Sequence, residues 1–292
     1  MSPRLPVGPA VELGPGDDAA LVTVQGGRVI ATTDVLVEGR HFRRDWSGPY
    51  DIGRKAAAQN LADVVAMGGR PTALLIGFAG PADTPVGWAE AFADGLRDEC
   101  ELVEAGVAGG DTVSAPLLVL SVTALGELLG ERPLTRSGAR PGDVVAVRGR
   151  LGWASAGLEL LLRGVFEPVE LIYAHRRPQP PYEAGMEALK AGATALLDVS
   201  DGLVQDLGHI ARASDVRIDL SAAAVRALAP EVPDRLRHAL TGGEDHAFAA
   251  TFPPEAVPGA GWAVVGRVTD GAGVVVDGRP YEGHGWDHFL TE

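Results

Sequence analysis

Apolar runs that are typical of buried strands alternate with helix-like segments in the first half of the chain. The strand-like runs cover residues 29–35, 72–78 and 117–125, and the helix-like segments between them cover 51–67 and 86–104. Each helix-like segment carries apolar residues close to the helical repeat of 3.6 residues. Strands that alternate with helices predict an α/β or α+β domain.

A connection rich in Pro and Gly separates this region from a second one. Residues 132–143 contain two Pro and two Gly, which are typical of a linker. We therefore expect two domains in the 292 residues, one over residues 1–135 and one over residues 136–292. In the second domain we expect strands, with helices between several of them, at 144–148, 195–199, 216–220, 246–252, 262–268 and 274–276.

Acidic residues recur where the local sequence looks like a turn or a strand end. They stand in Gly-Asp-Asp at 16–18, Thr-Thr-Asp at 32–34, Asn-Leu-Ala-Asp at 60–63, Gly-Gly-Asp-Thr at 109–112, Asp-Val-Ser-Asp-Gly at 198–202 and Gly-Gly-Glu-Asp at 242–245. Carboxylate and hydroxyl oxygens are the ligands that hard divalent cations prefer, and Mg²⁺ is commonly shared with phosphate oxygens. The pattern predicts a cation site whose other partner is a polyphosphate.

The run at residues 198–202 is the most specific of these. Alternation along a strand end places Asp198 and Ser200 on one side. Asp201 is predicted to cap a helix over 201–213, where free backbone N–H groups attract anions. A plain helix cap explains Asp201 but leaves Asp198 without a reason.

The helix predicted over residues 51–67 carries a second polar set. Asp51 is its expected N-cap. Residues four apart are neighbours on a helix, so Lys55, Gln59 and Asp63 share one face. A solvated helix face is the structural alternative for Asp63.

Composition and missing motifs exclude several classes of protein. The formal charge of −14 makes the chain a poor partner for nucleic acid or an anionic membrane. No apolar run reaches the ~18–20 residues of a membrane span. The single cysteine, Cys100, allows no intrachain disulfide, and Met1–Pro9 has no signal pattern, so we expect a cytoplasmic protein. The P-loop and protein-kinase motifs are absent.

The motifs taken together, in their order, resemble the thiamine-monophosphate kinases, a family of the aminoimidazole-ribonucleotide-synthetase-like ATP-binding superfamily. The resemblance rests on the runs above and on their extensions, which are Gly-Asp-Asp-Ala-Ala at 16–20, Thr-Thr-Asp-Val-Leu-Val-Glu-Gly-Arg-His-Phe at 32–42, the run at 60–69, Arg-Ser-Gly-Ala-Arg-Pro-Gly-Asp at 136–143, Asp-Val-Ser-Asp-Gly-Leu at 198–203 and Gly-Trp-Asp-His-Phe at 285–289. It spans nearly the whole chain.

The resemblance implies a two-domain PurM-like fold. The N-terminal α/β domain would bind ATP and Mg²⁺ and dimerise through its sheet, and the C-terminal domain would be α+β. The implied reaction transfers the γ-phosphoryl of ATP to thiamine monophosphate and yields thiamine diphosphate and ADP. We expect direct in-line transfer in a homodimer, with no phospho-enzyme and no general base, because the acceptor phosphate is already a nucleophile.

The resemblance also assigns residues to roles. The implied Mg²⁺ ligands are Asp17, Thr33, Asp34, Asp63, Asp111, Asp198 and Asp201. The implied nucleotide contacts are Gly110, Asp111, Arg136 and Ser200, and the implied thiamine-phosphate contacts are His41, Glu244, Asp245 and Trp286. Asp198, Asp201 and Arg136 are the implied catalytic residues. The scattered carboxylates are expected to converge into one magnesium cage.

Two departures from the family pattern stand out. His246-Ala247-Phe248 follows Gly-Gly-Glu-Asp where the family commonly has Tyr-Glu-Leu, which leaves open whether Glu244 or Asp245 contacts the substrate. Little sequence precedes Gly16, where the family usually has a longer acidic lead-in.

Other members of the superfamily fit less well. Selenophosphate synthetase would have a reactive cysteine near the N-terminus, and a hydrogenase-maturation protein would have one at the C-terminus. Aminoimidazole-ribonucleotide synthetase would show Gly-Val-Gly-Thr-Lys, which this chain lacks. A non-catalytic Ca²⁺- or nucleotide-binding regulator is the alternative from a different functional class, and an ATP-consumption assay with thiamine monophosphate separates the two.

Overall fold

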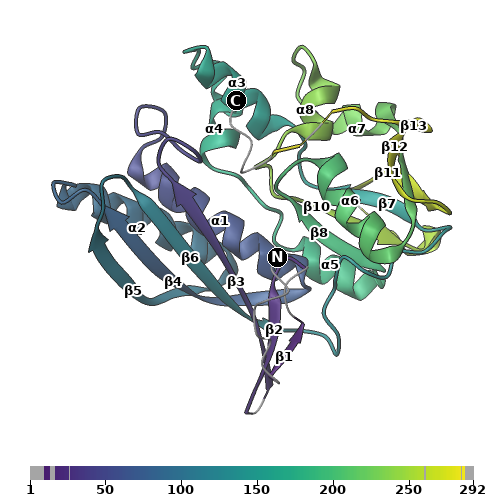
Figure 1. Cartoon of the computed structure of the whole chain (residues 1–292), viewed down its shortest axis with the longest axis horizontal. Helices are drawn as coiled ribbons and strands as arrows, with labels where there is room; N and C mark the ends of the chain where they lie inside the picture. The colour runs from purple at the N-terminus through teal and green to yellow at the C-terminus, as the bar shows by residue number, and fades with distance from the viewer. Residues whose placement is uncertain (1–9, 14–16, 26, 260, 284, 287–292) are drawn as a thin grey trace. The chain divides into compact units, whose positions relative to one another are not determined.

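The computed structural model describes residues 10–13, 17–25, 27–259, 261–283 and 285–286. The chain divides into two compact units, Met1–Pro133 and Leu134–Glu292. The sequence placed this division after residue 135. Each unit has its own sheet and its own helices (Figure 1).

The N-terminal unit is a six-stranded sheet with the order β1-β2-β3-β6-β4-β5. Its elements are β1 (Val11–Leu13), β2 (Ala20–Val24), β3 (Gly27–Val37), α1 (Pro49–Ala66), β4 (Gly69–Gly80), α2 (Val86–Cys100), a 3₁₀ turn (Glu101–Val103), β5 (Gly106–Ser114) and β6 (Val119–Leu128). Neighbouring strands are antiparallel except for β4 and β5, which are parallel.

One face of this sheet is buried under α1. Leu120, Val122 and Ala124 alternate along β6 and are fully buried, and α1 contacts β3, β4 and β6. On the opposite face, alternate apolar residues are exposed, including Val35, Leu75 and Val113. The sheet therefore has one face that α1 covers and one accessible face on which exposed apolar residues stand among polar ones.

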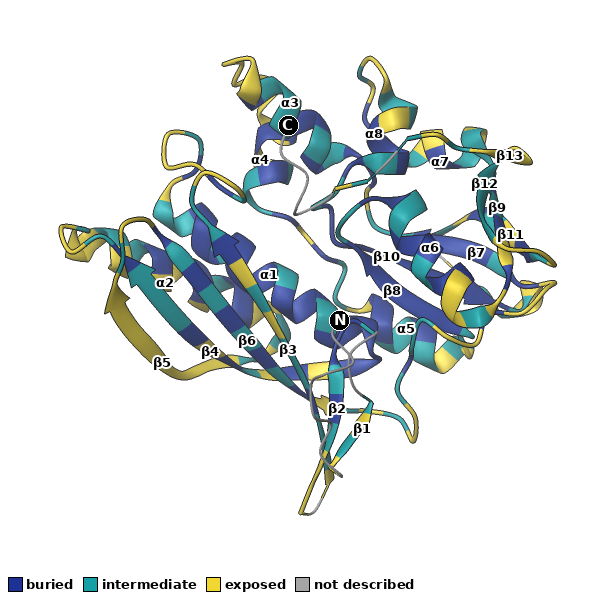
Figure 2. Ribbon diagram, viewed as in Figure 1, coloured by how far each residue is buried: buried dark blue, intermediate teal, exposed yellow. Residues whose placement is uncertain are grey.

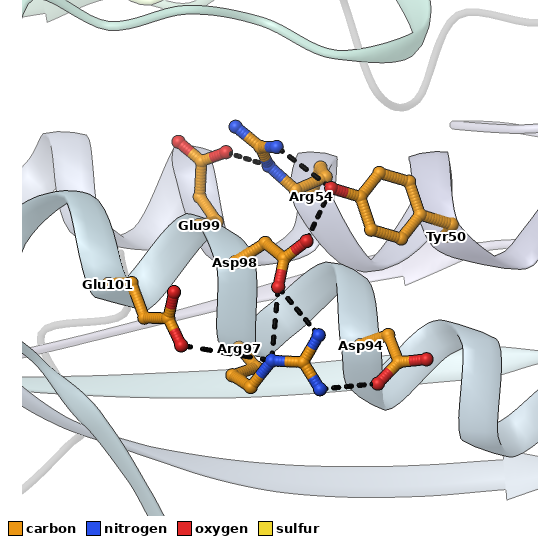
Figure 3. Close-up of polar contacts among 7 residues, drawn as sticks. All are labelled: Tyr50, Arg54, Asp94, Arg97, Asp98, Glu99 and Glu101. Carbon is orange, nitrogen blue, oxygen red and sulfur yellow. Dashed lines mark hydrogen bonds and ion pairs between the residues drawn. The ribbon is translucent and has the colours of Figure 1, made fainter.

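The two helices of this unit approach closely because glycines stand at their crossing. A Cβ at Gly53 would lie 2.2 Å from the carbonyl oxygen of Phe92, and one at Gly95 would lie 2.1 Å from that of Tyr50. Polar contacts between the helices follow on one side of the crossing (Figure 3). Arg54 pairs with the buried Glu99 there. These contacts hold α1 in a fixed position under the sheet.

The C-terminal unit is a seven-stranded sheet with the order β13-β12-β9-β11-β7-β10-β8. Its strands are β7 (Val144–Arg148), β8 (Ala195–Val199), β9 (Arg217–Leu220), β10 (Ala247–Phe252), β11 (Trp262–Thr269), β12 (Gly273–Val276) and β13 (Arg279–Pro280). Its helices are α3 (Trp153–Leu162), α4 (Val169–Arg176), α5 (Ala184–Ala191), α6 (Leu203–Ser214), α7 (Ala222–Leu228) and α8 (Arg235–Thr241), with a short 3₁₀ turn at Pro254–Ala256. The mixed α/β and α+β architecture predicted from the sequence is confirmed.

The core of this unit lies between α6 and the sheet. Leu203, Leu207 and Ile210 recur at helical spacing on α6, are fully buried, and belong to the same apolar cluster as Val145 and Leu197 of the sheet. All five residues of β8 are buried although β8 is an edge strand (Figure 2). A charged residue on β8 is therefore held in a largely dry environment.

Three details differ from the sequence predictions. Helix α6 begins at Leu203, and Asp201 does not cap it, because the Asp206 carboxylate accepts the N–H groups of Asp201 and Gly202 at 3.0 Å each. Helix α1 begins at Pro49, and Asp51 lies in its first turn without capping it. The Gly-Gly-Asp-Thr run lies inside β5 and does not form a turn.

No helix in the described part of the chain is both long and apolar enough to cross a membrane.

Candidate functional site

Strand β3 and helix α1 bring two of the predicted acidic residues together. The Thr32 hydroxyl donates to the Asp63 carboxylate at 2.8 Å. The Gln59 amide donates to Asp34 Oδ2 at 3.1 Å, and the Asp34 backbone N–H donates to Asn60 Oδ1 at 3.0 Å. Alternation along β3 turns Thr32 and Asp34 toward α1. The face of α1 that was predicted to be polar therefore meets β3 at Thr32 and Asp34, which lie inside the strand.

The donors at this place suit a hard cation. Their side chains present carboxylate, amide and hydroxyl oxygens, which Mg²⁺ prefers. Among the described residues, however, no three His, Cys, Asp or Glu side chains lie together as a group that could hold a metal ion. The fit to Mg²⁺ therefore rests on the chemistry of this set of donors.

Thr33 lies on the other face of β3. Its hydroxyl donates to the Val122 carbonyl at 3.0 Å and accepts from Thr123 at 3.1 Å. The structure does not bring this side chain together with Asp34 and Asp63, and its role as a ligand stays a prediction.

Asp111 is also separate from Asp34. It lies on the exposed strand β5, and strands β6 and β4 stand between β3 and β5. Three strand spacings correspond to about 14 Å. Strand pairing also places Asp111 on the accessible face of the sheet, level with Gly77. These two carboxylates therefore do not meet within the N-terminal unit.

Gly110 has a clear structural reason to be glycine. A Cβ there would lie 2.0 Å from the carbonyl oxygen of Ile76 on β4. The close approach of β5 to β4 requires a residue without a side chain, so this glycine is explained without a ligand.

Asp17 and His41 both lie toward the open end of the hairpin that β2 and β3 form, opposite its turn. Asp17 precedes Ala20, which pairs with Ala31 on β3, so the chain before β2 lies on the side of Asp34. The His41 ring accepts the Val37 N–H at Nδ1 at 3.0 Å, and Lys55 donates to the His41 carbonyl at 3.0 Å. The Nδ1 atom of His41 is therefore engaged by the backbone of β3.

In the C-terminal unit, the segment that follows β8 collects most of the predicted residues. The Glu244 N–H donates to the Ser200 carbonyl at 2.8 Å, and the Trp286 N–H donates to the Asp201 carbonyl at 2.9 Å. Gln205 donates to the Trp286 carbonyl at 2.8 Å and holds the same segment. The structure thus brings Ser200, Asp201, Glu244 and Trp286 together.

Asp198 is buried beside a histidine that sequence reasoning did not assign. His246 Nδ1 lies 2.9 Å from Asp198 Oδ2, and the two residues are 5% and 4% exposed. A buried carboxylate needs such a partner, because burial of an unpaired charge is costly. His246 directly follows the Gly-Gly-Glu-Asp run, which was the available signal in the sequence.

Glu244 and Asp245 have different surroundings. The buried Asp245 carboxylate accepts the N–H groups of Gly152 and Ala154, at 2.5 and 2.8 Å, where α3 begins. Burial raises the pKa of Asp245 to about 7, although these N–H groups favour its ionised form. The Glu244 side chain is 30% exposed and lies 3.2 Å from His175 of α4. His175 is a second residue that sequence reasoning missed.

Arg136 lies beside β8 and α6. The Thr135 carbonyl accepts the Leu196 N–H at 3.1 Å, and Ser214 of α6 donates to the Arg136 carbonyl at 3.3 Å. The His209 pKa is lowered to about 4 by burial first, and then by the charges of Arg136 and Arg212. Arg136 therefore contributes positive potential on this side of α6.

Comparison with known proteins identifies the family. The family model described as "AIR synthase related protein, N-terminal domain" matches residues 16–128. The thiamine-monophosphate kinase of Mycobacterium tuberculosis (strain ATCC 25618 / H37Rv) is 51% identical over 289 residues, which cover 96% of this chain and 86% of that protein. The chain belongs to the thiamine-monophosphate kinase family. The family member from Escherichia coli (strain K12) is 38% identical, with 96% and 93% covered.

Solved structures of the family agree with this assignment. The structure of AaThiL complexed with AMPPCP and TMP is similar, with a TM-score of 0.87 and 38% identity over 94% of this chain and 91% of that chain. The hydrogenase maturation protein HypE in complex with ATP shares only the fold, with a TM-score of 0.71 and 21% identity over 92% of this chain and 87% of that one. The PurM-like fold that the thiamine-monophosphate kinase resemblance implied is confirmed.

Proposed function

We propose that this chain transfers the γ-phosphoryl of ATP to thiamine monophosphate and produces thiamine diphosphate and ADP. The observation that carries the proposal is the match over nearly the whole chain to a thiamine-monophosphate kinase structure that holds AMPPCP, an ATP analogue, together with TMP. The 51% identity to a curated kinase of this name supports the same reaction.

Mg²⁺ would neutralise the charge of the two phosphate groups that must approach each other in this reaction. We assign Asp34 and Asp63 as ligands in the N-terminal unit, since each carboxylate accepts a hydrogen bond across the contact between β3 and α1. The other ligands that we propose are Asp17, Asp198 and Asp201, together with Thr33 and Asp111, whose side chains lie on the opposite face of the sheet from Asp34 and so do not share an ion with it within one unit.

The chain itself orients the reactants and supplies fixed charge. Arg136 adds a guanidinium beside the nucleotide phosphates, and Gly110, Asp111 and Ser200 complete the nucleotide contacts. The acceptor phosphate is ionised near neutral pH, so these residues need to align it without removing a proton. Transfer is then direct and in line.

On the thiamine side, we assign His41, Glu244 and Trp286. Trp286 is 37% exposed and offers an aromatic face to the cationic thiazolium ring. Glu244 is the carboxylate that contacts substrate, because both Asp245 oxygens already hold the start of α3. Asp245 supports the site by fixing the position of its neighbour.

The accessible sheet face of the N-terminal unit suits a second copy of the chain. Val35, Leu75 and Val113 are 44%, 41% and 53% exposed on that face. Burial of apolar area of this kind is the main favourable term in association. We propose a homodimer that works in the cytoplasm.

A coupled assay tests the proposed reaction. The protein is incubated with ATP, MgCl₂ and thiamine monophosphate, and both ADP and thiamine diphosphate are quantified. We expect the two products in equal amounts and no thiamine diphosphate when either substrate or Mg²⁺ is omitted. ADP without thiamine diphosphate, or neither product, would overturn the proposal.

A further inference from the structure

His246 and Asp198 form a buried pair where β10 begins and β8 ends. Phe248 of β10 is the strand partner of Asp198, so His246 lies two residues beyond that partner. The His246 Nδ1 to Asp198 Oδ2 distance is 2.9 Å. We propose that His246 is a positioning residue that holds the Asp198 carboxylate in the orientation in which it binds Mg²⁺. The proposal rests on the proposed function, which makes Asp198 a metal ligand.

The backbone at His246 is in a conformation that few residues accept. Its φ is +49°, in the left-handed region, and the φ of Glu244 is +68°. Non-glycine residues are uncommon there, although His is enriched among those that do occur. Such strain persists only where the surrounding structure fixes it, and it is concentrated at functional sites.

The surroundings of His246 provide this fixation. Its N–H donates to the Val199 carbonyl at 3.0 Å, and the Glu244 N–H donates to the Ser200 carbonyl. A Cβ at Gly243 would lie 2.4 Å from that same carbonyl oxygen. We call residues 243–246 the ligand-support turn, because it is fastened along the end of β8.

Asp245 fastens the ligand-support turn on its other side. Its carboxylate accepts two N–H groups at the start of α3, as described above. Successive residues of the turn thus reach in different directions, Asp245 to α3 and His246 to Asp198. The imidazole is therefore held in place before any metal binds.

A fixed imidazole has a direct consequence for the carboxylate. When Nδ1 donates to Oδ2, the hydrogen bond restrains rotation of the Asp198 carboxylate and sets the direction of Oδ1. Hydrogen bonds of this kind orient metal-binding side chains, and their loss typically weakens metal affinity by about 10- to 100-fold. A role in packing alone would lower stability but would leave metal affinity unchanged.

Two substitutions distinguish the loss of the His246 hydrogen-bond donor from an effect on the positive-φ backbone at this position. Asn and Gly both tolerate a positive φ, but only the Asn side chain has an N–H group to donate. The variants H246N and H246G are titrated with Mn²⁺ as the probe, by electron paramagnetic resonance, without nucleotide. We expect H246G to bind the Asp198-dependent Mn²⁺ about 10-fold more weakly or worse and H246N to stay within about 3-fold of the parent.

A double-mutant cycle shows whether His246 acts through Asp198. D198N identifies the Mn²⁺ that depends on Asp198, and H246G should weaken Mn²⁺ binding no further in the D198N background. Unfolding midpoints confirm that each variant is folded. If H246G does not fold, H246L replaces it, because Leu fills the buried space without a donor.

The proposal is overturned if H246G, or H246L in its place, binds Mn²⁺ like the parent, if H246N binds as weakly as that variant, or if D198N binds Mn²⁺ normally. The kinase assay on the unmodified chain is independent of these titrations. If the unmodified chain is an active kinase but the double-mutant cycle shows no coupling between His246 and Asp198, only the positioning role is refuted. If the cycle shows the coupling but the unmodified chain is inactive, only the proposed reaction is refuted.

Discussion

Glu99 on α2 forms an ion pair with Arg54 on α1 (Figure 3), and the Glu99 side chain is only 2% exposed. Tyr50 extends the contact, since its hydroxyl donates to Asp98 at 2.8 Å and accepts from Arg54 at 3.1 Å. Helix α1 also carries Gln59, Asn60 and Asp63. The contact between the helices therefore stabilises the element that holds the acidic site in the N-terminal unit.

Replacement of Glu99 by Ala should destabilise the protein strongly, because it leaves the half-buried Arg54 without its ion-pair partner. Loss of one partner of a buried pair costs about 3–5 kcal/mol, and the exposure of Arg54 favours the lower end of that range. Denaturant unfolding measures the change. Asp94→Asn breaks a contact to Arg97 on the exposed side of α2 and should leave the unfolding midpoint almost unchanged.

Asp198→Asn and Asp201→Asn should each reduce turnover by orders of magnitude while the fold stays intact, because the amide oxygen lacks the negative charge with which a carboxylate binds Mg²⁺. Steady-state assays over a range of MgCl₂ concentrations, with circular dichroism of each variant, test this. Asp215→Asn, at the opposite end of α6, is the control and should remain active. Near-normal turnover of both site variants would contradict their assignment as ligands.

Asp245 should make the free energy of unfolding decrease as pH rises, which is opposite to the usual effect of a carboxylate. Burial raises its folded pKa to about 7, above the ordinary value of 3.8, so between these values the folded state binds a proton that the unfolded state has released. Its contribution to the free energy of unfolding therefore decreases as pH rises from about 4 to 7 and is level above that. Unfolding of the parent and of D245N, compared at several pH values, should differ by this slope. Parallel pH profiles would show that Asp245 does not titrate in this range.

Glu244→Gln should raise the KM for thiamine monophosphate and leave the KM for ATP nearly unchanged. The Glu244 carboxylate is partly exposed, whereas the Asp245 carboxylate is engaged with α3. D245N should instead lower the unfolding midpoint, because one of its N–H contacts is lost. If E244Q leaves both KM values unchanged, Glu244 is not a substrate contact.

Leu75→Asp and Val113→Asp should convert the proposed dimer to a monomer, because each places a charge on the accessible apolar face of the sheet. Sedimentation equilibrium measures the mass. Val86→Asp is the control, since Val86 is 75% exposed at the start of α2 and away from that face. A parent chain that sediments as a monomer would contradict the proposed assembly.

Much of the fold followed from apolar periodicity. Residues 29–35 were predicted as a strand and form the middle of β3. Of the predicted polar helix face, Gln59 and Asp63 contact that strand, and Lys55 donates to the His41 carbonyl beyond it. Helices α7 and α8 were not predicted, because seven residues span two turns and give little periodic signal.

Local chemistry was a weaker guide to the site. Gly-Gly-Asp-Thr looked like a turn, yet Gly110 serves a close contact between strands, and a glycine pair looks the same in both settings. Asp201 looked like a helix cap, but Asp206 competes for the same N–H groups from within the helix. The pairing of Asp198 with His246 joins residues that are far apart in the chain, so no local pattern could show it.

The Asp206 carboxylate has an implication for how phosphate is recognised. Asp206 Oδ2 accepts the N–H groups of the two residues just before α6. The positive end of that helix dipole is therefore already neutralised from within the chain. An incoming anion gains little by approaching there and would meet a carboxylate instead. Phosphate recognition beside Ser200 must therefore depend on cations, either arginine or bound metal. Phosphate binding there should respond to the concentration of salt and metal ions more than to the geometry of the helix.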